Sequence, residues 1–128
     1  MENTSRRRFL QTAGTGAAAL ALSARSSPAA ANERIVVGLI GPGGMGTNHL
    51  KGLLARKNVE IAYVCDPDQK RLAAAAKLVE TRSKKTPKAI KDMREVYDDH
   101  QVDAVFIATP DHWHAPAAIL ALDAGKNV

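Results

Sequence analysis

After residue 31 the sequence alternates short apolar runs with segments whose apolar residues recur at helical spacing. The runs at residues 35–40, 59–65 and 103–108 are nearly unbroken in hydrophobicity, which is typical of strands covered on both faces. Helices are predicted at residues 44–56, 68–79 and 92–100 and from about Pro116 to Ala124, and a short edge strand at residues 88–90. This alternation predicts an α/β fold with a doubly wound parallel sheet of the Rossmann type.

The predicted helices carry signals of their orientation and of where they begin and end. The inward-facing positions are Leu50, Leu53 and Leu54 in the first helix and Leu72, Ala75, Ala76 and Val79 in the second. Asp92 and Glu95 have the spacing of a capping box. Pro116 near a helix start and Gly125 just past its end bracket the last helix.

The last three residues, 126–128, are expected to begin one more strand. With 128 residues, the chain has about the length of one ordinary domain. We therefore interpret residues 32–128 as an incomplete domain, truncated before its last strands, and the chain as a fragment.

Residues 1–31 have the features of an export signal. Arginines at positions 6–8 precede a weakly apolar stretch to Leu22 and a small-residue region that ends at Ala31. Polar residues and glycines interrupt the apolar stretch, so a transmembrane helix is not expected. The segment Ser5–Gln11 resembles the twin-arginine consensus S-R-R-x-F-L-K, which implies recognition by the twin-arginine export machinery and a periplasmic or other extracytoplasmic location. An ordinary secretory signal and an uncleaved membrane anchor are the alternatives.

The net charge of +5 does not indicate a nucleic-acid partner, because four arginines and one glutamate place +3 of it in residues 1–31. The remaining +2 is too small for a nucleic-acid footprint, and no recognition motif accompanies it. The single cysteine, Cys65, ends an apolar run and is interpreted as a small buried hydrophobic residue. No array of cysteines and histidines has zinc-ligand spacing, so no metal site is predicted.

A glycine-rich turn follows the first predicted strand and opens the first predicted helix. Gly41, Gly43 and Gly46 form the pattern G-x-G-x-x-G, which in this context is typical of a dinucleotide site. Gly41 permits the tight turn, Gly43 lets the backbone approach a pyrophosphate, and Gly46 lets helix and strand pack closely. The free N–H groups of the helix start, which includes Gly44 and Met45, are expected to meet the phosphate charge.

An acidic residue at the end of the second predicted strand supports the same interpretation. Asp66 comes 20 residues after Gly46, where a carboxylate accepts hydrogen bonds from the adenosine ribose and repels a 2′-phosphate, so NAD is favoured as the cofactor. NADP is an alternative because Lys70 or Arg71 can reach a 2′-phosphate from the following helix. Capping of that helix is a second role for Asp66. FAD-binding and methyltransferase domains share parts of the pattern.

A third polar segment, Thr109–His114, follows the strand that ends at Ala108. The carboxyl ends of parallel strands face one crevice, so this segment is expected to lie beside the glycine turn. His112 and His114 alone do not predict a metal site, because no third ligand is suitably placed. Trp113 is interpreted equally well as packing against the next helix or as a ligand contact, and His114 as the start of that helix.

These motifs, in this order, resemble the Gfo/Idh/MocA oxidoreductases over residues 33–128. The segments that carry the resemblance are the glycine turn, Cys65-Asp66, Ala108–His114 and Ala124–Val128. The family pattern T-P-N-x-x-H falls on Thr109, Pro110 and His114, with Asp111 in place of the usual asparagine. The resemblance implies that Ala108, Thr109 and Pro110 line the nicotinamide side of the cofactor and that His114 contacts it.

The resemblance also implies a two-domain enzyme that transfers hydride between NAD or NADP and a sugar or inositol carbon. A C-terminal domain, absent from this chain, is expected to bind the substrate and to support a homo-oligomer. The A-G-K-x-V segment of the family ordinarily leads into Glu-Lys-Pro, whose lysine is catalytic. That lysine is expected beyond Val128, so no catalytic residue is assigned and the chain alone is predicted to be inactive. An NAD-dependent glycoside hydrolase of the same family and a non-catalytic dinucleotide-binding or sensing module are the alternatives.

Overall fold

The computed structural model describes residues 34–128, and the predicted export signal at residues 1–31 lies outside the described residues. The strands of the described part are β1 (Ile35–Ile40), β2 (Val59–Cys65), β3 (Lys88–Ile90) and β4 (Ala104–Ile107). Its helices are α2 (Gly44–Leu54), α3 (Gln69–Ser83), α4 (Arg94–Asp98) and α5 (Asp111–Asp123). The strands form a parallel sheet in the order β3-β2-β1-β4, which confirms the predicted Rossmann-type fold.

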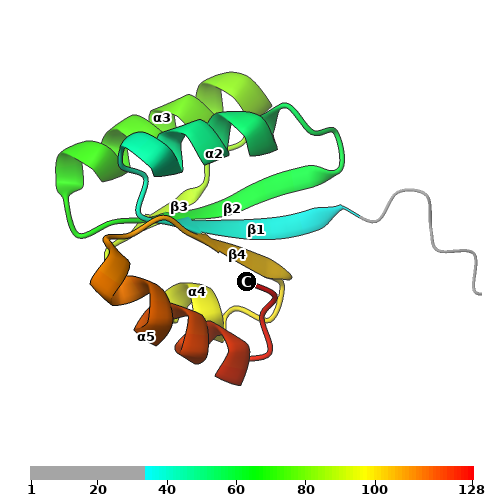
Figure 1. The fold of residues 1–128 in the computed structure, drawn as a ribbon. Coiled ribbons are helices and arrows are strands. Elements are labelled where there is room, and N and C mark those ends of the chain that lie inside the picture. The colour runs from blue at the N-terminus through cyan, green and yellow to red at the C-terminus, as the bar shows by residue number, and fades with distance from the viewer. Residues whose placement is uncertain (1–33) are drawn as a thin grey trace, which may run out of the picture. The chain divides into compact units, whose positions relative to one another are not determined.

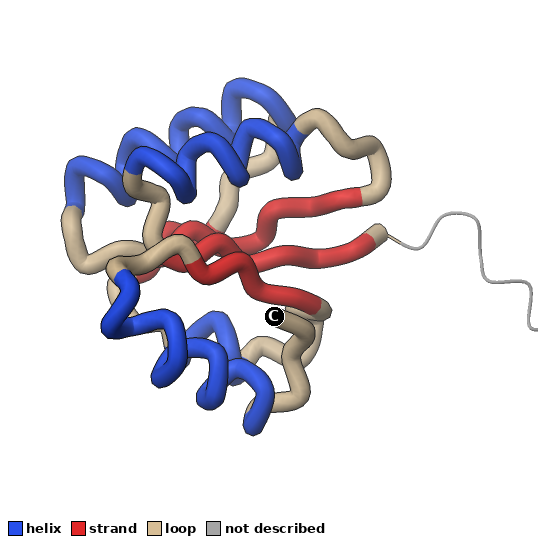
Figure 2. Tube along the Cα trace, in the orientation of Figure 1, coloured by secondary structure: helices blue, strands red, loops and turns tan. Residues whose placement is uncertain are grey.

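Helices cover both faces of the sheet, with α2 and α3 on one face and α4 and α5 on the other (Figure 1). Figure 2 shows the strands as one central layer between two helical layers. The buried cluster under α2 and α3 includes Val37, Leu39, Leu50, Val64, Leu72 and Val79. The cluster on the opposite face includes Ile40, Tyr63, Cys65, Val96, Val105 and Ala121. Side chains of neighbouring strand residues enter opposite clusters, which is why β1, β2 and β4 are nearly unbroken in hydrophobicity.

A single β-bridge forms after α5, at the place where a further strand is predicted. Asn127 forms a parallel bridge with Ala104, and the N–H of Val105 donates to the Asn127 carbonyl at 2.8 Å. The side chain of Lys126 is buried, and its Nζ donates to the carbonyl of Asp99 at 2.7 Å. These bonds hold the segment beside β4, on the side away from β1.

Helix α3 continues beyond its predicted end at Val79 and ends at Ser83. Its last turn is polar, so it carries no apolar period that could be recognised in the sequence. The hydroxyls of Thr81 and Ser83 donate to the carbonyls of Lys77 and Val79 inside the helix. Lys84, with a φ of 60°, adopts the left-handed conformation that ends the helix.

The predicted start of the last helix near Pro116 is wrong, because α5 begins at Asp111 and Pro116 lies inside it. Pro110 precedes the first turn with a φ of −57° and an extended ψ of 151°, and its carbonyl accepts from Trp113 N at 2.9 Å. Pro116 lacks the N–H that would bond to the carbonyl of His112, and the helix continues past this missing bond. Two segments predicted to be a loop and a helix start therefore form one helix.

The predicted capping box of Asp92 with Glu95 is wrong, because α4 begins after Met93 and has no side-chain cap. The Asp92 carboxylate instead accepts from the backbone N–H of Arg94 at 3.0 Å and from its guanidinium at 2.6 Å. The helix ends at Asp98 instead of His100, because the backbone turns extended at the next residue. The pair of Arg94 with Asp92 lowers the pKa of the Asp92 carboxyl to about 2.

Candidate functional site

A cavity of about 430 Å³ lies at the carboxyl ends of the strands, within the usual size range of small-molecule sites. Six of the ten residues predicted to bind a cofactor line it: Gly41, Gly43, Asp66, Ala108, Thr109 and Pro110. The other four lie outside its lining, with Gly44, Met45 and Gly46 in the first turn of α2 and His114 in the first turn of α5. The structure therefore brings the segments after β1, β2 and β4 to one cavity, as expected from the strand order.

Steric contacts require glycine at two positions of the turn after β1. Gly41 has a φ of 83°, and a Cβ there would lie 2.9 Å from the carbonyl carbon and oxygen of Ala108. A Cβ at Gly46 would overlap with the carbonyl oxygen of Gly41. The first glycine therefore allows contact between the loops after β1 and β4, and the second lets α2 start directly against the turn.

Gly43 faces open space and not a packed neighbour. A Cβ built there would have a single atom within 4 Å, Nη1 of Arg71 at 3.9 Å. Gly43 precedes α2, which has no capping side chain and no acidic residue in its first turn. The positive end of α2 is thus free to meet an anion that lies in the cavity.

Asp66 is held in one orientation at the other side of the cavity. Its side chain is buried, and Oδ1 accepts from the backbone N–H of Asp68 at 2.8 Å. Asp68, not Asp66, caps α3, since its carboxylate accepts from the N–H groups of Lys70 at 2.8 Å and Arg71 at 3.1 Å. The N–H groups of Arg71 and Lys70 lower the pKa of the Asp68 carboxyl. Asp66 is therefore left to face the cavity with a fixed carboxylate.

Cys65 also lines the cavity but has no features of a nucleophile. Only 2% of its surface is exposed. Burial, together with the negative charge of Asp66, raises the pKa of the thiol to about 12, so the thiol stays protonated. The prediction of a small buried hydrophobic residue is confirmed.

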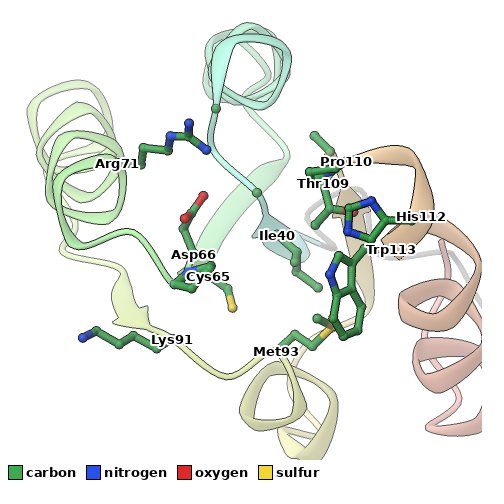
Figure 3. A pocket seen from close by; sticks show the side chains of 14 residues that line it. Ile40, Cys65, Asp66, Arg71, Lys91, Met93, Thr109, Pro110, His112 and Trp113 are labelled. Atoms are coloured by element: carbon green, nitrogen blue, oxygen red, sulfur yellow. The ribbon is translucent and has the colours of Figure 1, made fainter.

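The segment after β4 contributes the opposite wall of the cavity. The Thr109 hydroxyl is buried without a hydrogen-bond partner among the described residues. His114 does not reach the cavity; its Nε2 donates to the carbonyl of Thr109 at 2.7 Å and holds the loop against α5. His112 and Trp113 line the cavity instead, with Trp113 beside Met93 in Figure 3.

Comparison with known proteins agrees with this geometry. Residues 35–128 match the family described as "Oxidoreductase family, NAD-binding Rossmann fold", GFO_IDH_MocA. The chain belongs to this family. Its described residues form an NAD-binding Rossmann domain, and the glycine turn and Asp66 stand where the sequence predicts the dinucleotide.

A curated relative covers nearly the whole chain. The "Glycosyl hydrolase family 109 protein" of Shewanella pealeana is 32% identical over 96% of this chain, and the match covers 32% of that protein. The chain thus spans about a third of the length of the curated relatives it matches.

Solved structures show the same fold. The apo scyllo-inositol dehydrogenase from Lactobacillus casei superposes with a TM-score of 0.66 at 23% identity, over 74% of this chain and 27% of that chain. GenD2 from gentamicin A biosynthesis, solved in complex with NAD, has a TM-score of 0.62 at 31% identity, over 75% of this chain and 26% of that chain.

The family motifs do not identify every residue of the cavity. Ile40, Pro67, Lys91 and Met93 line it but were not predicted. Ile40 ends β1, Pro67 follows Asp66, and the other two follow β3. The rule that ligands lie beyond the carboxyl ends of parallel strands is the signal that points to them.

Two further findings concern the described residues alone. No three histidine, cysteine, aspartate or glutamate side chains within residues 34–128 come together in a way that would hold a metal ion. None of the helices in that range has the length and hydropathy needed to cross a membrane.

Proposed function

We propose that the whole protein is an NAD-dependent oxidoreductase that transfers hydride between NAD and a carbon of a sugar or inositol. One observation carries the proposal: a single cavity joins an open helix N-terminus at Gly43 to a buried, oriented carboxylate at Asp66. These are the two groups that a dinucleotide requires for its pyrophosphate and its adenosine ribose.

The residues of the cavity fit the parts of NAD. The first turn of α2 offers the backbone N–H groups of Gly44, Met45 and Gly46 to the pyrophosphate, because those of Gly41 and Gly43 already donate to backbone carbonyls. Asp66 accepts hydrogen bonds from the ribose hydroxyls. The unpartnered Thr109 hydroxyl offers one further hydrogen bond from the wall formed by the β4 loop. When bound, NAD supplies a nicotinamide ring that accepts or gives a hydride.

The described residues bind the cofactor but do not supply a complete reaction centre. Hydride transfer from an alcohol carbon requires a group that takes the hydroxyl proton. His112 is the histidine that lines the cavity, and no described residue orients its ring by a hydrogen bond. We place the proton-transfer group outside residues 34–128.

The test is to purify the whole protein, supply NAD with a panel of sugars and inositols, and follow the formation of NADH. We expect turnover with at least one polyol and tight NAD binding by calorimetry. NAD binding without turnover on any polyol or glycoside would instead favour a sensing module, and absence of NAD binding would overturn the proposal.

A second candidate function is NAD-dependent glycoside hydrolysis, in which the hydride returns to the product. The glycosyl hydrolase relative from Shewanella pealeana favours it, since the match extends over nearly the whole chain. Nitrophenyl glycosides distinguish the two candidates: release of nitrophenol that requires NAD but leaves no NADH identifies the hydrolase. Accumulation of NADH in proportion to product identifies the oxidoreductase.

We also propose that the protein is exported by the twin-arginine route and works outside the cytoplasm. The segment Ser5–Gln11 supports this, and a route that carries folded proteins suits a domain that is loaded with NAD before export. Replacing Arg6 and Arg7 together by lysine is expected to leave the protein in the cytoplasm, as measured by fractionation. Unchanged export of the double variant would contradict the proposed route.

A further inference from the structure

Arg71 is a cation at the cavity whose role the family motifs leave open. It lies in the first turn of α3, where its backbone N–H bonds to the Asp68 carboxylate at 3.1 Å. Figure 3 shows its side chain extending from α3 toward the turn that leads into α2, above the carboxylate of Asp66. The neighbouring Lys70 has the same helix cap but does not line the cavity.

The guanidinium of Arg71 lies beside Gly43. Its Nη1 is the atom nearest to a Cβ built on Gly43, at 3.9 Å. Among residues 34–128 no ion pair within 4.0 Å joins Arg71 to Asp66, although both line the same cavity. The guanidinium charge is thus directed to the glycine turn and is not neutralised by the nearby carboxylate.

Two positive features therefore meet at Gly43: the free N-terminus of α2 and the guanidinium of Arg71. A pyrophosphate carries two negative charges, and the planar donors of arginine suit phosphate oxygens. A 2′-phosphate would instead extend from the ribose that Asp66 binds, next to a carboxylate that repels it.

We propose that Arg71 binds the pyrophosphate of the cofactor and does not select for a 2′-phosphate. The inference rests on the proposed binding of NAD in this cavity. Arg71 then increases the affinity for every ligand that contains a diphosphate. It does not change the ratio of the affinities for NAD and NADP.

The experiment is calorimetric titration of the unmodified protein and of Arg71→Ala with four probes: adenosine, ADP, NAD and NADP. Lys70→Ala is the matched control, because it removes the same charge one residue earlier on the same helix turn. We expect Arg71→Ala to bind ADP and NAD about tenfold more weakly while adenosine binding changes less than about twofold. The NAD to NADP affinity ratio is expected to stay unchanged, and Lys70→Ala is expected to bind all four probes as the unmodified protein does.

Salt provides a second readout that a loss of folding would not imitate. The affinity of the unmodified protein for ADP is expected to fall more steeply with ionic strength than that of Arg71→Ala, because one charge pair is missing in the variant. Arg71→Lys is expected to restore part of the salt dependence.

Three outcomes would overturn the inference. They are unchanged ADP affinity in Arg71→Ala, a loss confined to NADP, and an equal loss for adenosine, which would place the guanidinium on the base. Failure of the unmodified protein to bind ADP and NAD at all would instead contradict the proposed function itself.

Discussion

Replacing Gly46 by alanine tests whether contact between α2 and the glycine turn holds the cavity in shape. The added Cβ would overlap with the Gly41 carbonyl oxygen, and it would lie 2.9 Å from the carbonyl carbon and 3.3 Å from Cβ of Ala108. The first two atoms belong to the backbone of the turn, so neither can move aside as a flexible side chain would. Helix α2 must therefore shift away from the end of β1.

The size of the effect follows from two opposing terms. Overpacking of a close contact costs about 1–3 kcal/mol. Alanine recovers up to about 1 kcal/mol relative to glycine inside a helix, which offsets part of that cost. With the full gain from alanine, the net expectation for Gly46→Ala is a loss of about 0–2 kcal/mol in the free energy of unfolding.

Alanine substitutions at two other glycines of the same turn are the controls for the steric effect. A Cβ at Gly44 would have no neighbour within 4 Å, so Gly44→Ala is expected to be neutral or slightly stabilising. Gly43→Ala is expected to lower NAD affinity more than stability, because its Cβ would enter the free space at the start of α2.

The assay is urea denaturation followed by circular dichroism, together with calorimetric titration of NAD for each variant. We expect the denaturation midpoint of Gly46→Ala to fall clearly below that of Gly44→Ala. Equal midpoints for these two variants would refute the argument that the contact between α2 and the turn is sterically required.

Three further predictions concern residues at or near the cavity. Asp66→Ser is expected to narrow or reverse a preference for NAD over NADP, measured by titration of both cofactors, because it removes the carboxylate that repels a 2′-phosphate. Cys65 is expected to resist alkylation until the protein unfolds. Burial raises the pKa of its thiol from 9.0 to about 12, so its contribution to the free energy of unfolding is present below pH 9 and is lost as the pH rises toward 12. Alkaline denaturation measures this loss. Tyr63→Phe removes the hydroxyl that donates to Asp99 at 2.6 Å and is expected to cost about 1–2 kcal/mol in urea denaturation.

Three of the four described strands could be predicted to the residue, and β4 is one residue shorter at each end than the predicted run 103–108. β1, β2 and β3 begin and end where predicted, since the apolar runs of β1 and β2 end at a glycine turn and at Asp66-Pro67. Helix ends were less predictable. The end of α3 depends on hydrogen bonds from hydroxyl groups within a polar turn. The start of α5 depends on Pro110, and the first residues of that helix are polar and aromatic, so they carry no apolar period.

The site could be predicted only where a residue type is required by the backbone or by its direct neighbours. Gly41 has a positive φ and Gly46 has no space for a Cβ, so both positions require glycine and appear in the pattern G-x-G-x-x-G. The position of Arg71 beside Gly43 depends on how α3 packs against α2. The sequence alone offered Arg71 only an alternative role, as one of two side chains that can reach a 2′-phosphate. Lys91 lines the cavity because it directly follows the short strand β3, and no sequence motif marks it.

The two walls of the cavity are joined by direct contact, which links the cofactor site to the strand order. The Ala108 N–H donates to the Ile40 carbonyl at 2.9 Å, and the missing side chain of Gly41 leaves room for the Ala108 carbonyl group. The pairing of β4 with β1 therefore places the Ala108 carbonyl group against the glycine turn. Because Asp66 and the glycine turn lie within one strand–helix–strand unit, they specify a dinucleotide site in general. Thr109 and His112 face the cavity from the segment after β4, which lies outside that unit. This segment is where the cavity of a family member can differ from that of other Rossmann domains.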